Sequence, residues 1–206
     1  PNTPETVNAA LNLVKHGLQQ IGSNIQIAAG AEYMIDGDFE LSNDLLCLKD
    51  KYLLIEMSYL NETPNIDQII FDLQIKGYKV VLAHPERYNF YHQNHARYHR
   101  LRDMGCLFQL NLLSVTGYYG KAVKIAADYL LQKKLYDLAG TDLHHDKHLF
   151  ALERAVKNGS LYQSLGKYEF KNKELFAFIQ INLTLNNWFL VTINIFSKPY
   201  LFPFWI

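Results

Sequence analysis

The sequence has few of the features that mark several large classes of protein. It contains two cysteines in 206 residues, Cys47 and Cys106, and their spacing fits no disulfide framework, so a reducing cytoplasm is expected. Lysine plus arginine number 20 and so do aspartate plus glutamate, which is not the basic excess of a typical nucleic-acid-binding protein. No run is long and apolar enough for a confident membrane span, and residue 1 begins polar sequence without a signal-peptide pattern.

Two motifs for phosphate chemistry are also missing. No apolar strand candidate is followed by G-x-G-x-x-G or G-x-x-x-x-G-K-[ST], which argues against nucleotide binding. Neither cysteine begins a C-x-x-x-x-x-R loop, because Leu53 and Leu112 occupy the positions where the arginine would stand. Phosphatase chemistry that depends on a cysteine nucleophile is therefore unsupported.

The sequence does contain apolar segments that recur at similar intervals and alternate with helical patterns. Strands are predicted at residues 25–29, 52–55, 79–83, 107–110 and 136–139. Helices are predicted at residues 4–21, 63–77, 94–104, 121–133 and 147–157. Alternation of this kind predicts an α/β fold with a parallel sheet, and an open doubly wound sheet and a closed barrel both fit.

The two ends of the chain differ in character. Thr3 and Pro4 suit the start of the first helix, and its apolar stripe is expected to face the core. That stripe consists of Val7, Leu11, Val14, Leu18 and Ile21. Residues 177–206 carry one charge, Lys198, and alternate apolar and polar residues around Asn186-Asn187, which favours a β-hairpin. We therefore divide the chain into a domain of residues 1–176 and an apolar tail of residues 177–206.

Acidic and imidazole side chains stand at or just after several predicted strands. They are Glu32, Glu56, His84, Asp142 and His144. Because the carboxyl ends of parallel strands lie on one face of the fold, where α/β proteins bind ligands, we expect these side chains to converge. Carboxylate and imidazole ligands without a thiolate suit manganese, iron or zinc. The sequence therefore predicts a metal site at this face.

Arg87 follows the third strand in the segment "HPERY", and its guanidinium can bind phosphate with two parallel hydrogen bonds. An ion pair with Glu86 or a nearby aspartate fits the spacing equally well. A weaker candidate is a metal site formed by three histidines at helical spacing, His92, His95 and His99. The simpler interpretation is that they lie on a solvated helix face. Tyr118-Tyr119 fits an aromatic wall or a simple turn.

Several segments together resemble a known family. The segments "GAEY", "IEMS", "LAHPERY", "FQLNLLSVTGYYG" and "LAGTDLHH" resemble, in order and approximate spacing, the bacterial protein-tyrosine phosphatases of capsular polysaccharide biosynthesis (CpsB/YwqE type) of the PHP superfamily. The resemblance covers residues 1–176 and implies a distorted (β/α)7 barrel. It implies metal ligands at Glu32, Glu56, His84, Asp142 and His144, with His84 and Arg87 as the catalytic residues. The implied metal is a cluster of manganese ions, with zinc and iron as alternatives.

The sequence departs from this family at its start. The family has an H-x-H motif on its first strand and a T-P-H histidine on its second, and neither is present, since His16 is the only histidine before His84. We therefore expect an incomplete barrel without its first strands, fewer metal ions, and a tail that is foreign to the family.

The resemblance implies hydrolysis of phosphotyrosine on the tail of a bacterial tyrosine autokinase in polysaccharide biosynthesis. Two alternatives stay open. The first is an inactive relative that acts as a binding module for the same partner. The second is another PHP phosphoesterase, either a histidinol-phosphatase-like enzyme or a nuclease, and the balanced charge weighs against the nuclease.

Overall fold

A computed structural model describes residues 3–36, 39–41, 45–176 and 195–196. Its centre is a parallel sheet with the strand order β5-β4-β3-β2-β1-β6. The strands are β1 (Ala31–Met34), β2 (Tyr52–Glu56), β3 (Lys79–Ala83), β4 (Leu107–Asn111), β5 (Leu138–Gly140) and β6 (Ile195–Phe196). Because every pair is parallel, all carboxyl ends lie at the same edge of the sheet.

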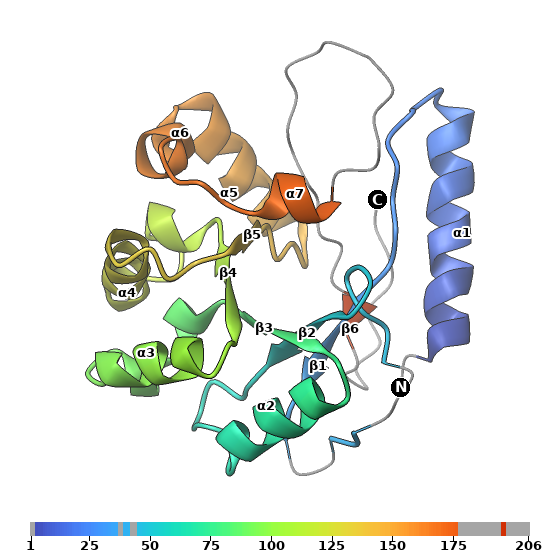
Figure 1. Ribbon diagram of the computed structural model, residues 1–206. Coiled ribbons are helices and arrows are strands. Elements are labelled where there is room, and N and C mark those ends of the chain that lie inside the picture. The colour runs from blue at the N-terminus through green and yellow to red at the C-terminus, as the bar shows by residue number, and fades with distance from the viewer. Residues whose placement is uncertain (1–2, 37–38, 42–44, 177–194, 197–206) are drawn as a thin grey trace.

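Helices cover the outer side of the curved sheet (Figure 1). They are α2 (Ile66–Ile75), α3 (His95–Asp103), α4 (Lys121–Gln132), α5 (Asp146–Lys157) and α6 (Ser160–Leu165). The short 3-10 helices η1 (Pro85–Arg87), η2 (Asn89–Tyr91) and η3 (Ser114–Thr116) follow β3 and β4. Gly77 and Gly105, with φ of 85° and 84°, end the turns after α2 and α3 in the left-handed conformation that glycine adopts without a Cβ clash.

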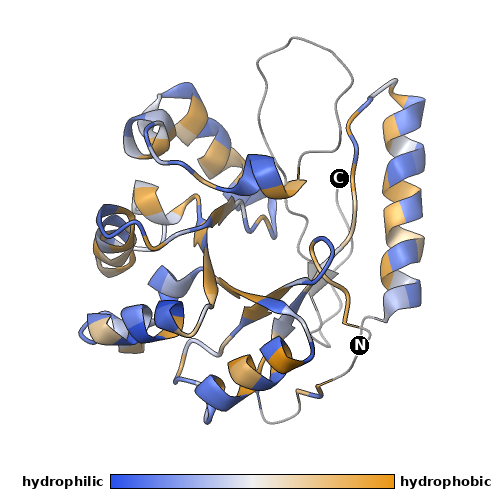
Figure 2. Ribbon diagram, in the orientation of Figure 1, coloured by the Kyte–Doolittle hydropathy of each residue, from blue (hydrophilic) through white to orange (hydrophobic). Residues whose placement is uncertain are grey.

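The strands are apolar on both faces, as expected for a parallel sheet that is covered on both sides. Leu53, Ile55 and Leu82 face the helices and belong to the main core. On the other face, Leu54, Val81, Ala83 and Leu138 form a smaller cluster. Leu175 and Phe176 from α7 (Asn172–Phe176) pack against this second cluster. Figure 2 shows the apolar residues concentrated along the strands and on the sheet-facing sides of the helices.

The predicted positions of three strands and of the main helices are confirmed within three residues at each end. The first strand is displaced, because residues 25–29 pair with no strand and the sheet begins at Ala31, whose N–H donates to the Leu46 carbonyl. Gly30 passes so close to the Cys47 carbonyl oxygen that a Cβ would lie 2.9 Å from it. The last predicted strand begins at Leu138 instead of 136, because the N–H of Tyr136 donates to the Tyr168 hydroxyl.

Helix α1 (Pro4–Gln20) forms as predicted, with Thr3 and Thr6 making a reciprocal capping box at its start. The prediction that its apolar stripe faces the core is wrong, because Val7 is its one buried residue and Val14 is 40% exposed. In Figure 1 the helix stands apart from the sheet. Helices α6 and α7 were not predicted, since each is too short to show a clear period.

The predicted hairpin of the tail lies outside the described residues, apart from β6, which pairs in parallel with β1. The two cysteines form no disulfide. None of the helices in the described part of the chain combines the length and apolar character needed to cross a membrane.

Candidate metal and phosphate site

The predicted site residues lie in or soon after four strands of the sheet, β1, β2, β3 and β5. Glu32 lies within β1 and Glu56 is the last residue of β2, so both stand in the strands and not after them. The register pairs Glu32 with Leu54 and Met34 with Glu56, which places the two carboxylates on the same face of the sheet. His84 directly follows β3, and Asp142 follows β5 after one intervening residue.

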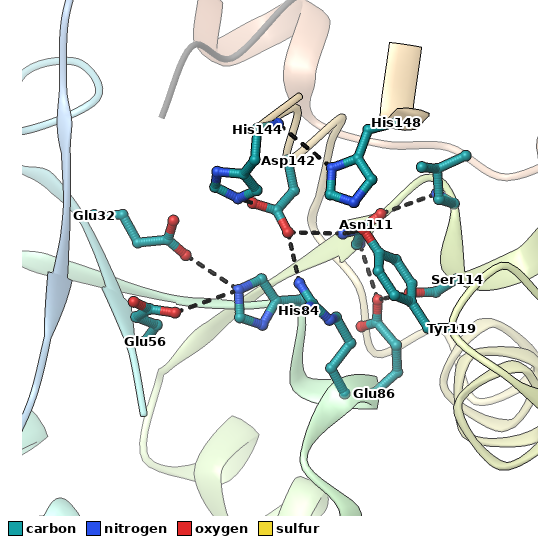
Figure 3. A network of polar contacts seen from close by, with 12 residues as sticks. Glu32, Glu56, His84, Glu86, Asn111, Ser114, Tyr119, Asp142, His144 and His148 are labelled. Carbon is teal, nitrogen blue, oxygen red and sulfur yellow. Dashed lines mark hydrogen bonds and ion pairs between the residues drawn. The ribbon is translucent and has the colours of Figure 1, made fainter. Parts of the chain in front are cut away.

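Glu32, His84 and Asp142 form a compact group (Figure 3). Each offers one ligand atom, and these atoms lie within 4.8 Å of one another. The Nε2 atom of His84 is 3.2 Å from Oε1 of Glu32 and 3.8 Å from Oε2 of Glu56. All four residues are buried. The structure thus places Glu56 at the edge of the group, where its carboxylate lies near the His84 ring.

The Glu32 carboxylate is the least satisfied group in this site. Both of its oxygens are buried and neither accepts a well-aligned hydrogen bond from the described residues, despite the close His84 ring. A buried carboxylate without donors is costly in free energy, whereas a bound cation would satisfy it. Burial disfavours the charged imidazole, yet the Glu32 carboxylate outweighs it and raises the pKa of His84. The donor set therefore fits a divalent cation.

Asp142 joins this group to the cationic side of the site. Its Oδ1 lies 2.5 Å from Nε2 of His144, and its Oδ2 accepts hydrogen bonds from Arg87 at 2.6 Å and from Asn111 at 2.9 Å. Burial opposes ionisation, but the His144 hydrogen bond and the charges of His84, His144 and Arg87 lower the pKa of Asp142 to about 2. The carboxylate is therefore ionised at neutral pH.

Two of these residues have an unusual backbone. His84 has φ of 36° and Asp142 has φ of 48°, in the left-handed region that most side chains avoid. The backbone therefore turns at Asp142, and His144, two residues on, contacts the Asp142 carboxylate. His144 lies outside the three-residue group.

Glu86 connects the segments around the site through hydrogen bonds, a role that the sequence did not predict. It is fully buried, and its carboxylate accepts hydrogen bonds from the Asn111 N–H, the Ser114 hydroxyl and the Tyr136 hydroxyl. Burial raises the pKa of Glu86, against the effect of these donors. The contacts tie η1, which carries Arg87, to β4, η3 and the segment before β5. Arg87 therefore pairs with Asp142 and not with Glu86, which the sequence left open.

The weaker sequence candidates have other partners. The ring of His92 contacts the Glu86 carbonyl at 2.7 Å, and the Nε2 atom of His99 lies 3.0 Å from the Tyr129 hydroxyl. His95 stacks on Tyr129 with ring centroids 3.8 Å apart. Among the described residues these histidines form no group that could hold a metal ion. They pack against other elements and do not form a solvated helix face.

The comparisons with known proteins give the family. The family described as "Capsular polysaccharide synthesis, CpsB/CapC" matches residues 1–157. The chain belongs to this family. It is 31% identical over 150 residues to the tyrosine-protein phosphatase YwqE of Bacillus subtilis (strain 168), covering 71% of this chain and 59% of YwqE. It is 30% identical over 141 residues to the tyrosine-protein phosphatase CpsB of Streptococcus pneumoniae, covering 64% of this chain and 58% of CpsB.

A structural comparison agrees with the family. The fold is similar to a chain from the crystal structures of YwqE and CpsB, which are described as "unique metal-dependent tyrosine phosphatases". The TM-score is 0.63 at 27% sequence identity, with 80% of this chain and 72% of that chain covered. The α/β fold with a parallel sheet is therefore shared. The chain spans 59% and 58% of the length of YwqE and CpsB.

Proposed function

We propose that this chain carries the site of a metal-dependent phosphatase that hydrolyses phosphotyrosine on a protein in capsule biosynthesis. The observation that carries this proposal is the buried group of Glu32, His84 and Asp142 beside Arg87, in which neither Glu32 oxygen accepts a well-aligned hydrogen bond from the described residues. The family membership and the names of the relatives support the substrate class. The proposed substrate protein is a bacterial tyrosine kinase.

Glu32, His84 and Asp142 would hold the metal, with Glu56 and His144 beside them as further ligands. Manganese is the proposed metal, because the carboxylate and imidazole donors suit it, and the same donors admit iron and zinc. When bound, such a cation lowers the pKa of a coordinated water and offsets charge on phosphate oxygens. Arg87 would bind the phosphate, and Asp142 orients its guanidinium through NH1.

Three further proposals follow from the same family membership. The curved parallel sheet is proposed to be part of a distorted (β/α)7 PHP-type barrel, with residues 1–176 as the phosphatase domain and 177–206 as a separate tail. The chain is proposed to work in the cytoplasm, which agrees with two cysteines that form no disulfide.

Metal content and hydrolysis of a phosphotyrosine peptide test the function. The full chain with added manganese is expected to retain metal after desalting and to release phosphate from the peptide. Glu32→Gln removes the charge from the buried carboxylate and is expected to abolish both. Glu169→Gln makes the same change at an exposed position and serves as the matched control. Arg87→Lys keeps the charge but loses the planar fork, and kcat/KM is expected to fall about 10- to 100-fold.

A chain that neither retains metal nor releases phosphate would contradict this function. If it also bound the phosphotyrosine peptide tightly in the presence of a chelator, the binding-module alternative would be favoured instead.

A further inference from the structure

The Arg87 guanidinium lies against two tyrosine rings that come from different strand ends. We infer that Tyr59 and Tyr119 are positioning residues that hold the Arg87 guanidinium edge-on toward the phosphate group. This inference rests on the proposed role of Arg87. Tyr59 follows β2, Arg87 ends η1 after β3, and Tyr119 lies between η3 and α4 after β4. Three separate segments therefore meet at one side chain.

The distances place both rings against the guanidinium. Its Cζ atom is 4.7 Å from the centroid of the Tyr59 ring and 4.3 Å from that of Tyr119. Both values are well within the 6 Å at which a cation is attracted to an aromatic face. The Arg87 side chain is 18% exposed, so the contacts are partly shielded from water. Contact with two rings restricts rotation of the guanidinium.

Each tyrosine is itself fixed by neighbours in the site. The Tyr119 hydroxyl accepts a hydrogen bond of 3.2 Å from the Asn111 amide, which also donates to Asp142. One amide thus sets the position of Tyr119 and of the Arg87 ion-pair partner together. The Tyr59 ring stacks on His84, with centroids 5.8 Å apart and an angle of 27°, and also contacts Tyr88 at 6.0 Å.

The remaining donors of Arg87 indicate what the arrangement is for. NH1 donates to Asp142, and within the described residues Nε and NH2 have no hydrogen-bond acceptor. Both tyrosine rings lie against the guanidinium, and on our inference they leave its free edge for a ligand. A phosphate group accepts two parallel hydrogen bonds from such an edge. A guanidinium that is held in place before binding loses less rotational freedom when the anion arrives.

Tyr59 offers the cleanest test because it is 39% exposed and its truncation leaves the buried core intact. The dissociation constant of inorganic phosphate is measured by titration calorimetry on the manganese-loaded chain, together with kcat and KM for a phosphotyrosine peptide. Tyr59→Leu and Tyr119→Leu are each expected to weaken phosphate binding about 3- to 30-fold, the range of a partly shielded cation–π contact. Tyr59→Phe retains the ring and is expected to stay within about twofold of the unchanged chain.

Tyr162→Leu is the matched control, since Tyr162 is 80% exposed on α6 and contacts none of these residues. The effect of Tyr59→Leu is expected in KM more than in kcat, because the lost contact orients a binding group. A Tyr59→Leu chain that binds phosphate as well as the unchanged chain would overturn the inference and leave the proposed function intact.

A second readout does not depend on activity. The side-chain nitrogen signals of Arg87, assigned by their loss in Arg87→Lys, report how fast the guanidinium rotates about its Nε–Cζ bond. Slow rotation in the unchanged chain that becomes faster in Tyr59→Leu and Tyr119→Leu would support the inference, even if the chain proved unable to hydrolyse phosphotyrosine. Equal rotation rates in all variants would overturn it.

Discussion

Cys47 and Cys106 have the same side-chain chemistry but different surroundings. Cys106 is fully buried just before β4, and burial raises the pKa of its thiol to about 12. Cys47 is half-buried, and burial also raises the pKa of its thiol. Since the thiolate is the reactive form, Cys106 is expected to be inert at neutral pH.

This contrast gives a prediction for alkylation. At pH 8 in the folded protein, iodoacetamide is expected to modify Cys47 well before Cys106, while both react once the protein is unfolded in urea. Mass spectrometry of the labelled peptides measures the two rates. Equal labelling of both thiols in the folded state would contradict the burial of Cys106.

Single residues at the site differ in how far the sequence could reveal them. Glu32, His84 and Asp142 could be found because each stands at or near the end of an apolar segment, where parallel strands place ligands. Glu86 and Tyr59 could not be found in this way. Their roles depend on contacts with residues far along the chain, such as Tyr136 for Glu86 and Arg87 for Tyr59, and no local pattern encodes these contacts.

Among the elements, α2 shows how one helix face contributes to stability. Ile70 is fully buried against β3 and its neighbours, whereas Ile75 on the same helix is 72% exposed. Ile70→Ala is expected to lower the free energy of unfolding by about 2–5 kcal/mol, because it removes buried methylenes and leaves a cavity.

Ile75→Ala makes the same chemical change at the exposed position and is the control. It is expected to change the free energy of unfolding by less than about 0.5 kcal/mol. Urea titrations followed by circular dichroism measure both variants. Equal destabilisation by the two substitutions would mean that the exposed side of α2 is covered by another surface in solution.

An ion-pair network links α2 to α3. Arg97 of α3 donates to Asp67 of α2 at 2.5 Å and to Glu62 at 2.5 Å. The Arg97 hydrogen bond lowers the pKa of Asp67 below its ordinary value of 3.8. A carboxyl group whose pKa is lower in the folded state stabilises the fold above its unfolded pKa and loses that contribution as the pH falls.

Asp67→Asn is therefore expected to be destabilising at pH 6, with the difference from the unchanged chain shrinking as the pH falls below about 4. Urea midpoints at a series of pH values test this. Asp50→Asn serves as a control at an exposed turn. A difference that stays constant with pH would show that the Asp67 charge does not contribute.

The elements themselves were predictable to different degrees. The strands β2, β3 and β4 were found from their apolar runs, since strands buried on both faces are apolar throughout. The strand β1 was misplaced because residues 25–29 are equally apolar, and only pairing with β2 decides which segment is the strand. The prediction that the apolar stripe of α1 is buried was wrong for a related reason. Periodicity shows that a helix has an apolar face but not what covers it.

For the whole molecule, the poorly satisfied Glu32 carboxylate leads us to expect that stability rises when a metal ion binds. A cation that binds the folded chain and not the unfolded chain stabilises it by mass action, by about 2.7 kcal/mol at a hundred times the dissociation constant. For a chain of this size that corresponds to a rise of about 5–10 °C in Tm. Added manganese is expected to produce such a rise in a thermal shift measurement.

A chelator is expected to reverse this rise, and Glu32→Gln is expected to show none. Magnesium, which prefers an octahedral shell with several waters, is expected to have a smaller effect. A Tm that manganese leaves unchanged in the unsubstituted chain would mean that these residues do not bind the cation in the folded state.

The left-handed backbone at His84 and Asp142 has a consequence for how this chain would change under selection. Glycine tolerates such a conformation without the steric penalty that a side chain incurs, so a change to glycine at either position would relieve local strain. The same change would remove a buried side chain and leave Glu32 or Arg87 without its partner, which costs about 3–5 kcal/mol against about 1–3 kcal/mol of strain relieved. Selection for heat resistance alone is therefore expected to keep both side chains, even without selection for the proposed activity.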